Sequence, residues 1–97
     1  MQFLSMSRRK TDQFPPDAFT PELLRQEAAR IREFYAAGIL RQIWMRGDTP
    51  GACLLWEAEN EGAVRDAIAS LPLFRAGMLE VVAFVPLAPY PGFGPLA

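Results

Sequence analysis

Histidine is absent from this 97-residue sequence, and cysteine and lysine each occur only once, as Cys53 and Lys10. Without histidine the chain has no Ser/His or Cys/His nucleophile pair and no imidazole base. A zinc site of the usual histidine and cysteine type is excluded, and a single cysteine forms no internal disulfide. Any acid–base chemistry therefore depends on carboxylates, lysine, tyrosine or water.

An excess of either charge is also missing, since ten basic residues face eleven acidic ones for a net charge of −1. This balance does not favour nucleic-acid binding, which needs a clustered basic excess.

The basic run at residues 8–10 follows a short apolar start, which is the wrong order for a signal peptide. No run approaches the roughly 18 apolar residues of a membrane span. We expect one cytoplasmic domain over residues 1–97.

The first half of the chain predicts a strand, a helix and a hairpin. Residues 1–7 alternate in part, with Phe3 on one face and Leu4 and Met6 on the other. Thr20 followed by proline is a typical helix start, and Gly38 is a natural stop for a helix that ends near residue 37. Residues 39–58 predict two strands around a Pro/Gly turn.

The second half predicts a helix, a strand and a tail. Asn60 can cap a helix that ends before Pro72, and residues 78–87 form a nearly continuous apolar strand. The order β-α-β-β-α-β predicts a ferredoxin-like α+β fold, with a four-stranded antiparallel sheet and both helices on one face. The other face would carry Trp44 and Trp56 or their alternates, so we expect a second copy of the chain to cover it.

The tail, residues 88–97, combines prolines and glycines with Tyr90 and Phe93. It is either disordered or docked on a neighbouring subunit, and aromatic residues among prolines favour docking.

Glu27 is out of place in the first helix. At about 100° per residue, Leu24, Ala28, Ile31 and Tyr35 form an apolar stripe with Leu23 and Phe34 along one edge. Glu27 projects between that edge and the centre of the stripe, where an ionised carboxylate is costly unless it is paired, hydrogen-bonded or protonated. Glu27 either acts as a base in a pocket, where desolvation raises its pKa, or it pairs with Arg41 or bends to the helix edge.

Other side chains suit a small anionic, planar ligand. Arg41 can bind a carboxylate through two hydrogen bonds, or it is an exposed or ion-paired strand arginine. Trp44, Trp56 and Tyr35 can form the wall of a pocket for a flat ring, or they belong to the core or to a dimer interface.

The stretches "GILRQIW" at 38–44 and "LPLFRAGMLEV" at 71–81 resemble the muconolactone delta-isomerase family. This resemblance implies a dimeric α+β barrel fold and a cytoplasmic homodimer or higher oligomer such as a decamer. It also implies a role in aromatic catabolism through the β-ketoadipate pathway, where the family shifts a double bond in a lactone ring without cofactor or metal. Glu27, Arg41 and Trp44 match a glutamate, an arginine and a tryptophan of the family.

Three positions depart from the family pattern. The known isomerases have a lysine where this chain has Ala28, and histidines where it has Gln42 and Thr49. We therefore expect an isomerase-like enzyme with Glu27 as its base or, alternatively, a non-catalytic oligomer that binds a ligand or partner in the same cleft. A third reading is cofactor-independent oxygenation of an aromatic, which the related fold allows.

Overall fold

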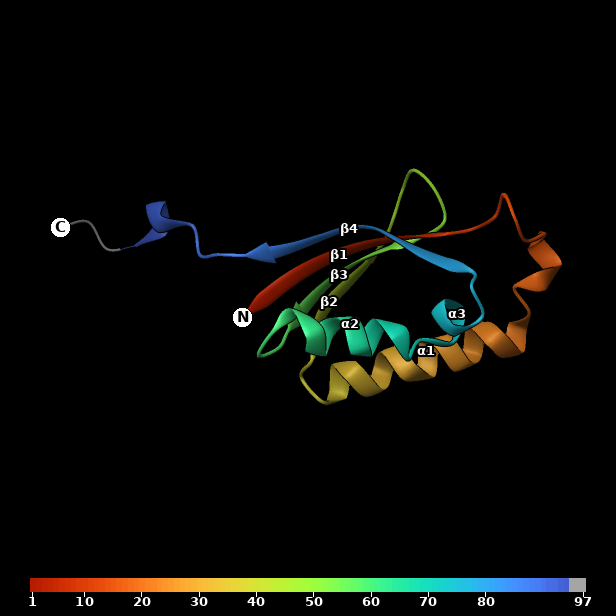
Figure 1. Ribbon diagram of the computed structural model, residues 1–97, viewed down its shortest axis with the longest axis horizontal. Helices are drawn as coiled ribbons and strands as arrows, with labels where there is room; N and C mark the ends of the chain where they lie inside the picture. Colours follow the sequence, from red (N-terminus) through yellow and green to blue (C-terminus); the bar gives the residue numbers. More distant parts are fainter. Residues whose placement is uncertain (95–97) are drawn as a thin grey trace.

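The computed structural model describes residues 1–94 as one antiparallel sheet with helices on one face (Figure 1). The strands are β1 (Gln2–Arg9), β2 (Leu40–Met45), β3 (Ala52–Glu57) and β4 (Leu79–Leu87). They follow the order β2-β3-β1-β4 across the sheet, so β2 and β4 are the two edge strands. The helices are α1 (Pro21–Ala36), α2 (Glu61–Ala69) and α3 (Pro72–Arg75), with single 3-10 turns at η1 (Pro16–Ala18) and η2 (Pro91–Phe93). The predicted α+β, ferredoxin-like fold is confirmed.

Both long helices begin at the predicted caps. The Thr20 hydroxyl oxygen accepts a hydrogen bond from the Leu23 N–H at 3.1 Å, and the Asn60 side-chain oxygen accepts one from the Ala63 N–H at 2.9 Å. Each cap satisfies one of the backbone donors that a helix start leaves free. Gly38, just after α1, has a φ of 79°, which a residue with a side chain rarely adopts.

The short helix α3 was not predicted, because the sequence analysis treats Pro72 only as a stop for the preceding helix. Proline also suits the first position of a new helix, since its missing N–H is not needed there. The turn ends at Gly77, whose φ is 73°. This extra turn brings Leu73 against α1, where it contributes to the site.

The core lies between the sheet and the helices. Trp56 is completely buried, and its ring stacks edge-on against Phe34 with 5.8 Å between the ring centroids. The indole N–H donates to the hydroxyl of Ser5, also buried, at 2.9 Å. A buried polar group is satisfied in this way, so Trp56 is a structural core residue in this subunit.

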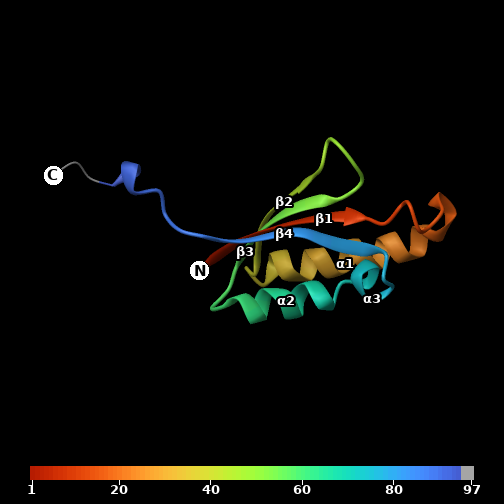
Figure 2. The same cartoon turned by 45° about the horizontal axis from the view of Figure 1, so that its top comes forward.

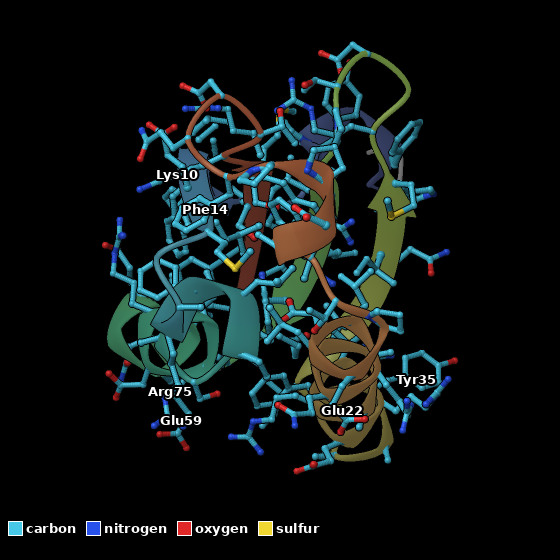
Figure 3. The ribbon with its side chains drawn as sticks, turned by 90° about the vertical axis from the view of Figure 1, so that its right-hand side faces the viewer. Lys10, Phe14, Glu22, Tyr35, Glu59 and Arg75 are labelled. Carbon is cyan, nitrogen blue, oxygen red and sulfur yellow. The ribbon has the colours of Figure 1, made fainter. Side chains whose placement is uncertain are left out.

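The face that α1 buries is rotated from the predicted stripe. Phe34, predicted at the edge, is buried, whereas Tyr35, predicted inside the stripe, is 65% exposed. Tyr35 points outward beside α1 (Figure 3). The rotation brings Glu27 closer to the centre of the buried face than its sequence pattern indicates.

The two tryptophans lie on opposite faces of the sheet, so the expectation that they share a face is wrong. The register pairs Trp44 with Cys53 and pairs Leu40 with Trp56, and directly opposed residues share a face. Trp44 is half exposed on the face without helices. The apolar residues of this open face are Leu4, Met6, Trp44, Cys53, Leu55, Ala83, Val85 and Leu87, and the same register places the polar residues Gln2, Arg8, Gln42, Glu57 and Glu80 on it.

The tail leaves the body of the fold beyond β4, as both ribbon views show (Figures 1 and 2). Tyr90 and Phe93 pack against each other at 4.9 Å between ring centroids but are otherwise exposed. Residues 95–97 of the expected tail lie outside the described residues. Among residues 1–94, no helix is long and apolar enough to cross a membrane.

Candidate functional site

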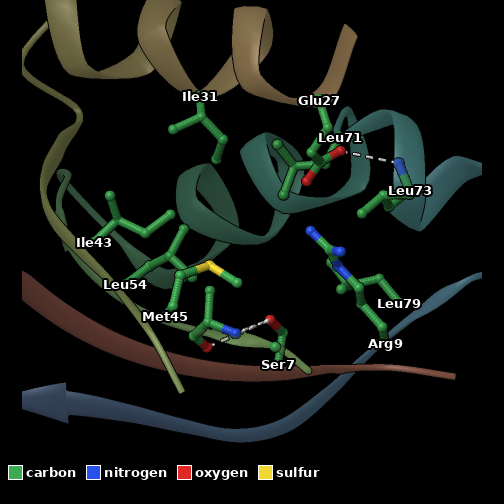
Figure 4. A pocket seen from close by; sticks show the side chains of 12 residues that line it. Ser7, Arg9, Glu27, Ile31, Ile43, Met45, Leu54, Leu71, Leu73 and Leu79 are labelled. Atoms are coloured by element: carbon green, nitrogen blue, oxygen red, sulfur yellow. Dashed lines mark hydrogen bonds between the residues drawn. The ribbon is translucent and has the colours of Figure 1, made fainter. Parts of the chain in front are cut away.

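A cavity of about 90 Å³ opens between α1, α3 and the sheet (Figure 4). Its polar groups come from three residues, namely Ser7 and Arg9 of β1 and Glu27 of α1. The rest of the lining is glycine, alanine and larger apolar residues: Ile31, Ile43, Met45, Gly51, Ala52, Leu54, Leu71, Leu73 and Leu79. A small apolar cavity with a few convergent polar groups is the usual form of a ligand site.

Glu27 enters this cavity from α1 and is held at one oxygen. Its Oε1 accepts a hydrogen bond from the Leu73 N–H of α3 at 3.0 Å, and its second oxygen points into the cavity (Figure 4). Burial raises the pKa of the Glu27 carboxyl above its ordinary value near 4.5, and the Leu73 N–H and the positive charge of Arg9 oppose that rise only in part. A carboxyl fixed at one oxygen, with a raised pKa, suits a general base.

Ser7 forms the floor of the cavity where β1 approaches the start of β3. Its hydroxyl accepts from the Ala52 N–H at 3.3 Å and donates to the Ala52 carbonyl at 3.4 Å. Gly51 lies against the Ser7 backbone so closely that an added Cβ would overlap the Ser7 carbonyl oxygen. The Ser7 hydroxyl is therefore committed to the fold.

Arg9 is the site residue that the sequence analysis missed, because it treats the residue as part of a basic run. Strand alternation from the buried Phe3 leads through Ser5 and Ser7 to Arg9, so the period of β1 could have placed it. Arg9 is paired with the buried Leu79, which confirms that its side chain lies on the helix side of the sheet.

The four predicted substrate-binding residues do not line this cavity in the described part of the chain. Arg41 is the extra residue of a β-bulge, because Leu40 opposes Trp56 and Gln42 opposes Leu55. Strict alternation along β2 would put Arg41 on the face of Ile43 and Met45, and the bulge removes it from that face. Arg41 and Tyr35 instead border a separate hollow near Gly38.

The alternative in which Glu27 pairs with Arg41 is absent from the ion pairs of residues 1–94, and Glu27 is bound to α3 instead. In that same range, no group of three or more histidine, cysteine, aspartate or glutamate side chains is placed to hold a metal ion. The chemistry that these residues can supply is proton transfer at Glu27 and attraction of an anion by Arg9.

Two solved structures are similar to this chain in fold. Muconolactone isomerase, solved at 3.3 Å resolution, superposes with a TM-score of 0.75 at 19% identity, over 94% of this chain and 92% of that one. A 5-chloro-2-hydroxyhydroquinone dehydrochlorinase from Burkholderia phenoliruptrix AC1100, in complex with 2,5-dihydroxybenzoquinone, gives a TM-score of 0.61 at 19% identity, over 88% and 89%.

Sequence comparison points the same way. No curated protein matches the chain. The sequence profile of one family, muconolactone delta-isomerase, matches residues 1–92. That match spans nearly all of the sequence and agrees with the fold, so the chain belongs to the muconolactone delta-isomerase family.

Proposed function

We propose that this protein is an isomerase that moves a C=C bond within a small unsaturated lactone by transferring one proton, with Glu27 as the base. The observation that carries the proposal is the Glu27 carboxyl, which is fixed at one oxygen by the Leu73 N–H and raised in pKa inside an apolar cavity. A raised pKa brings a carboxyl closer to the operating pH, which favours both removal and return of a proton.

The chemistry requires one base and no change of oxidation state. The free oxygen of Glu27 removes a proton from the saturated ring carbon attached to the far end of the double bond that is conjugated to the lactone carbonyl. The electron pair of that C–H bond forms the new double bond, and the negative charge moves to the carbonyl oxygen. The protonated Glu27 then returns the proton to the carbon next to the carbonyl, so the product is an isomer of the substrate.

The substrate-binding roles of Arg41, Tyr35, Trp44 and Trp56 stay predictions from the sequence. Arg41 and Tyr35 border another hollow, Trp44 lies on the open face, and Trp56 is enclosed in the core. In this proposal, the first three reach a substrate only in an assembly in which they extend the cavity of a neighbouring copy.

A homodimer, and a higher oligomer such as a decamer, forms part of the proposal. The open sheet face defined above carries exposed apolar side chains, with Trp44 50% and Val85 45% exposed, and exposed apolar patches of this kind favour association. The rim of the cavity is also open, because Ile43 and Met45 are 36% and 67% exposed. The cytoplasmic location and the place in aromatic catabolism through the β-ketoadipate pathway likewise stay predictions.

Muconolactone is the substrate to test first. Its ultraviolet absorption changes when the double bond moves, so turnover can be followed directly. We expect Glu27→Gln to lower kcat by about 10²-fold to 10⁴-fold, the usual contribution of a general base. The matched control is Glu22→Gln, which changes an exposed glutamate of the same helix. Equal loss in both variants, or full activity in Glu27→Gln, would refute the role of Glu27.

The alternative is a member of the family that binds a ligand without turning it over. The departures from the family pattern at Ala28, Gln42 and Thr49 favour this hypothesis, because the known isomerases have a lysine and two histidines at these positions. Tight binding of muconolactone with no spectral change would support this alternative over catalysis.

A further inference from the structure

We propose that Arg9 binds the carboxylate of the ligand in the Glu27 cavity, so that the site selects small ring compounds that carry a carboxylate side chain. This inference deepens the proposed function and rests on it for the choice of substrate. It assigns the anchoring role to an arginine that belongs to β1, instead of Arg41, which lies at the β2 bulge outside the cavity.

The backbone of Arg9 is fixed on both sides. Its N–H donates to the Pro50 carbonyl at 2.9 Å, and its carbonyl accepts from the Thr11 N–H at 2.9 Å. Its Cα is paired with that of Leu79 in β4. The side chain therefore starts from a rigid strand end, and it points up into the cavity toward the Glu27 and Leu73 side (Figure 4).

The guanidinium of Arg9 has no carboxylate partner among the ion pairs of residues 1–94, although most other arginines in this range have one. Arg8, its neighbour on the opposite face of β1, pairs with both Asp12 and Glu80. The Arg9 guanidinium carbon lies over the Phe19 ring, 5.9 Å from its centroid. A partly buried cation without a carboxylate partner loses hydration, and a bound anion offsets that loss.

A carboxylate is an anion that this cation can bind through two hydrogen bonds. The planar guanidinium fork matches the two oxygens of a carboxylate in a bidentate pair. The cavity beyond the fork is apolar and small, which suits a single ring. Because Glu27 approaches from α1 and Arg9 from β1, a ligand held at Arg9 by its side chain presents its ring to the free oxygen of Glu27.

The test measures binding of a ligand that cannot be isomerised. The probe is a saturated five-membered lactone with an acetate side chain, and its methyl ester is the uncharged control; calorimetry on the full chain gives both affinities. We expect Arg9→Gln to weaken binding of the acetate by about 10-fold to 100-fold and to change binding of the ester by less than 2-fold. Arg9→Lys keeps the charge without the fork and recovers part of the loss.

The matched control is Arg8→Gln, which removes the adjacent arginine from the opposite face and leaves acetate binding unchanged. A loss in Arg41→Gln in place of Arg9→Gln overturns the proposal, as does equal weakening of acetate and ester. Failure of the wild-type protein to prefer the acetate over the ester overturns it as well. Thermal unfolding of each variant shows whether a loss of binding results from unfolding. If Arg9→Gln is unfolded, the affinity of Arg9→Lys for the acetate, compared with its affinity for the ester, decides the test.

The outcomes separate this inference from the proposed function. If Arg9 governs acetate binding but muconolactone is not turned over, the anchoring role stands and the isomerase proposal fails. If turnover depends on Glu27 while Arg9→Gln leaves KM unchanged, the isomerase proposal stands and the anchoring role fails.

Discussion

Replacing Gly51 by alanine tests how the floor of the cavity is built. Gly51 is buried just before β3, and a Cβ there would overlap the Ser7 carbonyl oxygen and lie 3.0 Å from both the Ser7 carbonyl carbon and the Arg8 Cα. All three atoms belong to the backbone of β1. No side-chain rotation can relieve the overlap, so one of the two strands must move.

That movement has a cost that the local hydrogen bonds define. The Arg9 N–H bonds to the Pro50 carbonyl at 2.9 Å and the Ala52 N–H bonds to the Ser7 hydroxyl at 3.3 Å, and both bonds lengthen if β1 separates from the segment around Gly51. Each bond contributes about 0.5–1.5 kcal/mol, and overpacking in a close-packed region costs about 1–3 kcal/mol. We expect Gly51→Ala to lower the free energy of unfolding by about 3 kcal/mol.

Thermal unfolding, followed by circular dichroism at one fixed protein concentration, measures this effect. A loss of about 3 kcal/mol lowers Tm by roughly 12–24 °C in a domain of this size. The control is Gly47→Ala in the same hairpin loop, where an added Cβ meets nothing within 4 Å. If the Tm of Gly51→Ala lies within about 2 °C of both wild type and control, the close approach does not constrain the fold and the reasoning is wrong.

Three further predictions concern the core, the base and the tail. Ser5→Ala leaves the buried Trp56 N–H without its acceptor and should cost about 1–3 kcal/mol in urea unfolding; no loss would mean that the indole finds another acceptor. Because the pKa of Glu27 is raised in the folded state, protonation of this group stabilises the fold at low pH, and this stability is lost as pH rises through the folded pKa. Glu27→Gln should therefore remove this decrease in the free energy of unfolding with rising pH. An unchanged dependence of the free energy of unfolding on pH would contradict the raised pKa. Deleting residues 88–97 should reduce oligomer size in light scattering, and unchanged assembly would exclude docking of the tail.

The fold could be predicted because its signals are local. Thr20 and Asn60 are capping residues that act within one turn, and the alternation of β1 is visible in the sequence itself. The predictions that failed concern how one element is aligned with another. The bulge at Arg41 and the register that separates Trp44 from Trp56 depend on how two strands pair, which neither strand specifies alone.

Prediction of the site from the sequence was limited in the same way. The helical period correctly directs Glu27 toward the sheet, but its partner, the Leu73 N–H, is 46 residues away in a helix that the sequence analysis did not predict. Arg9 was missed because a basic run at the surface is the common reading of three consecutive cations. Only the pairing of Arg9 with Leu79 puts its side chain on the same side of the sheet as Glu27.

The separation of the two charged groups explains how one cavity can serve both proposed roles. A direct ion pair between Arg9 and Glu27 would lower the pKa of the carboxyl and weaken it as a base, and it would also occupy the guanidinium. In the structure Glu27 is bound to the Leu73 N–H instead, and desolvation outweighs the combined effect of that N–H and of Arg9 on its pKa. The carboxyl keeps the raised pKa that a proton-transfer base needs, and the guanidinium keeps its donors for an anion that arrives with the substrate.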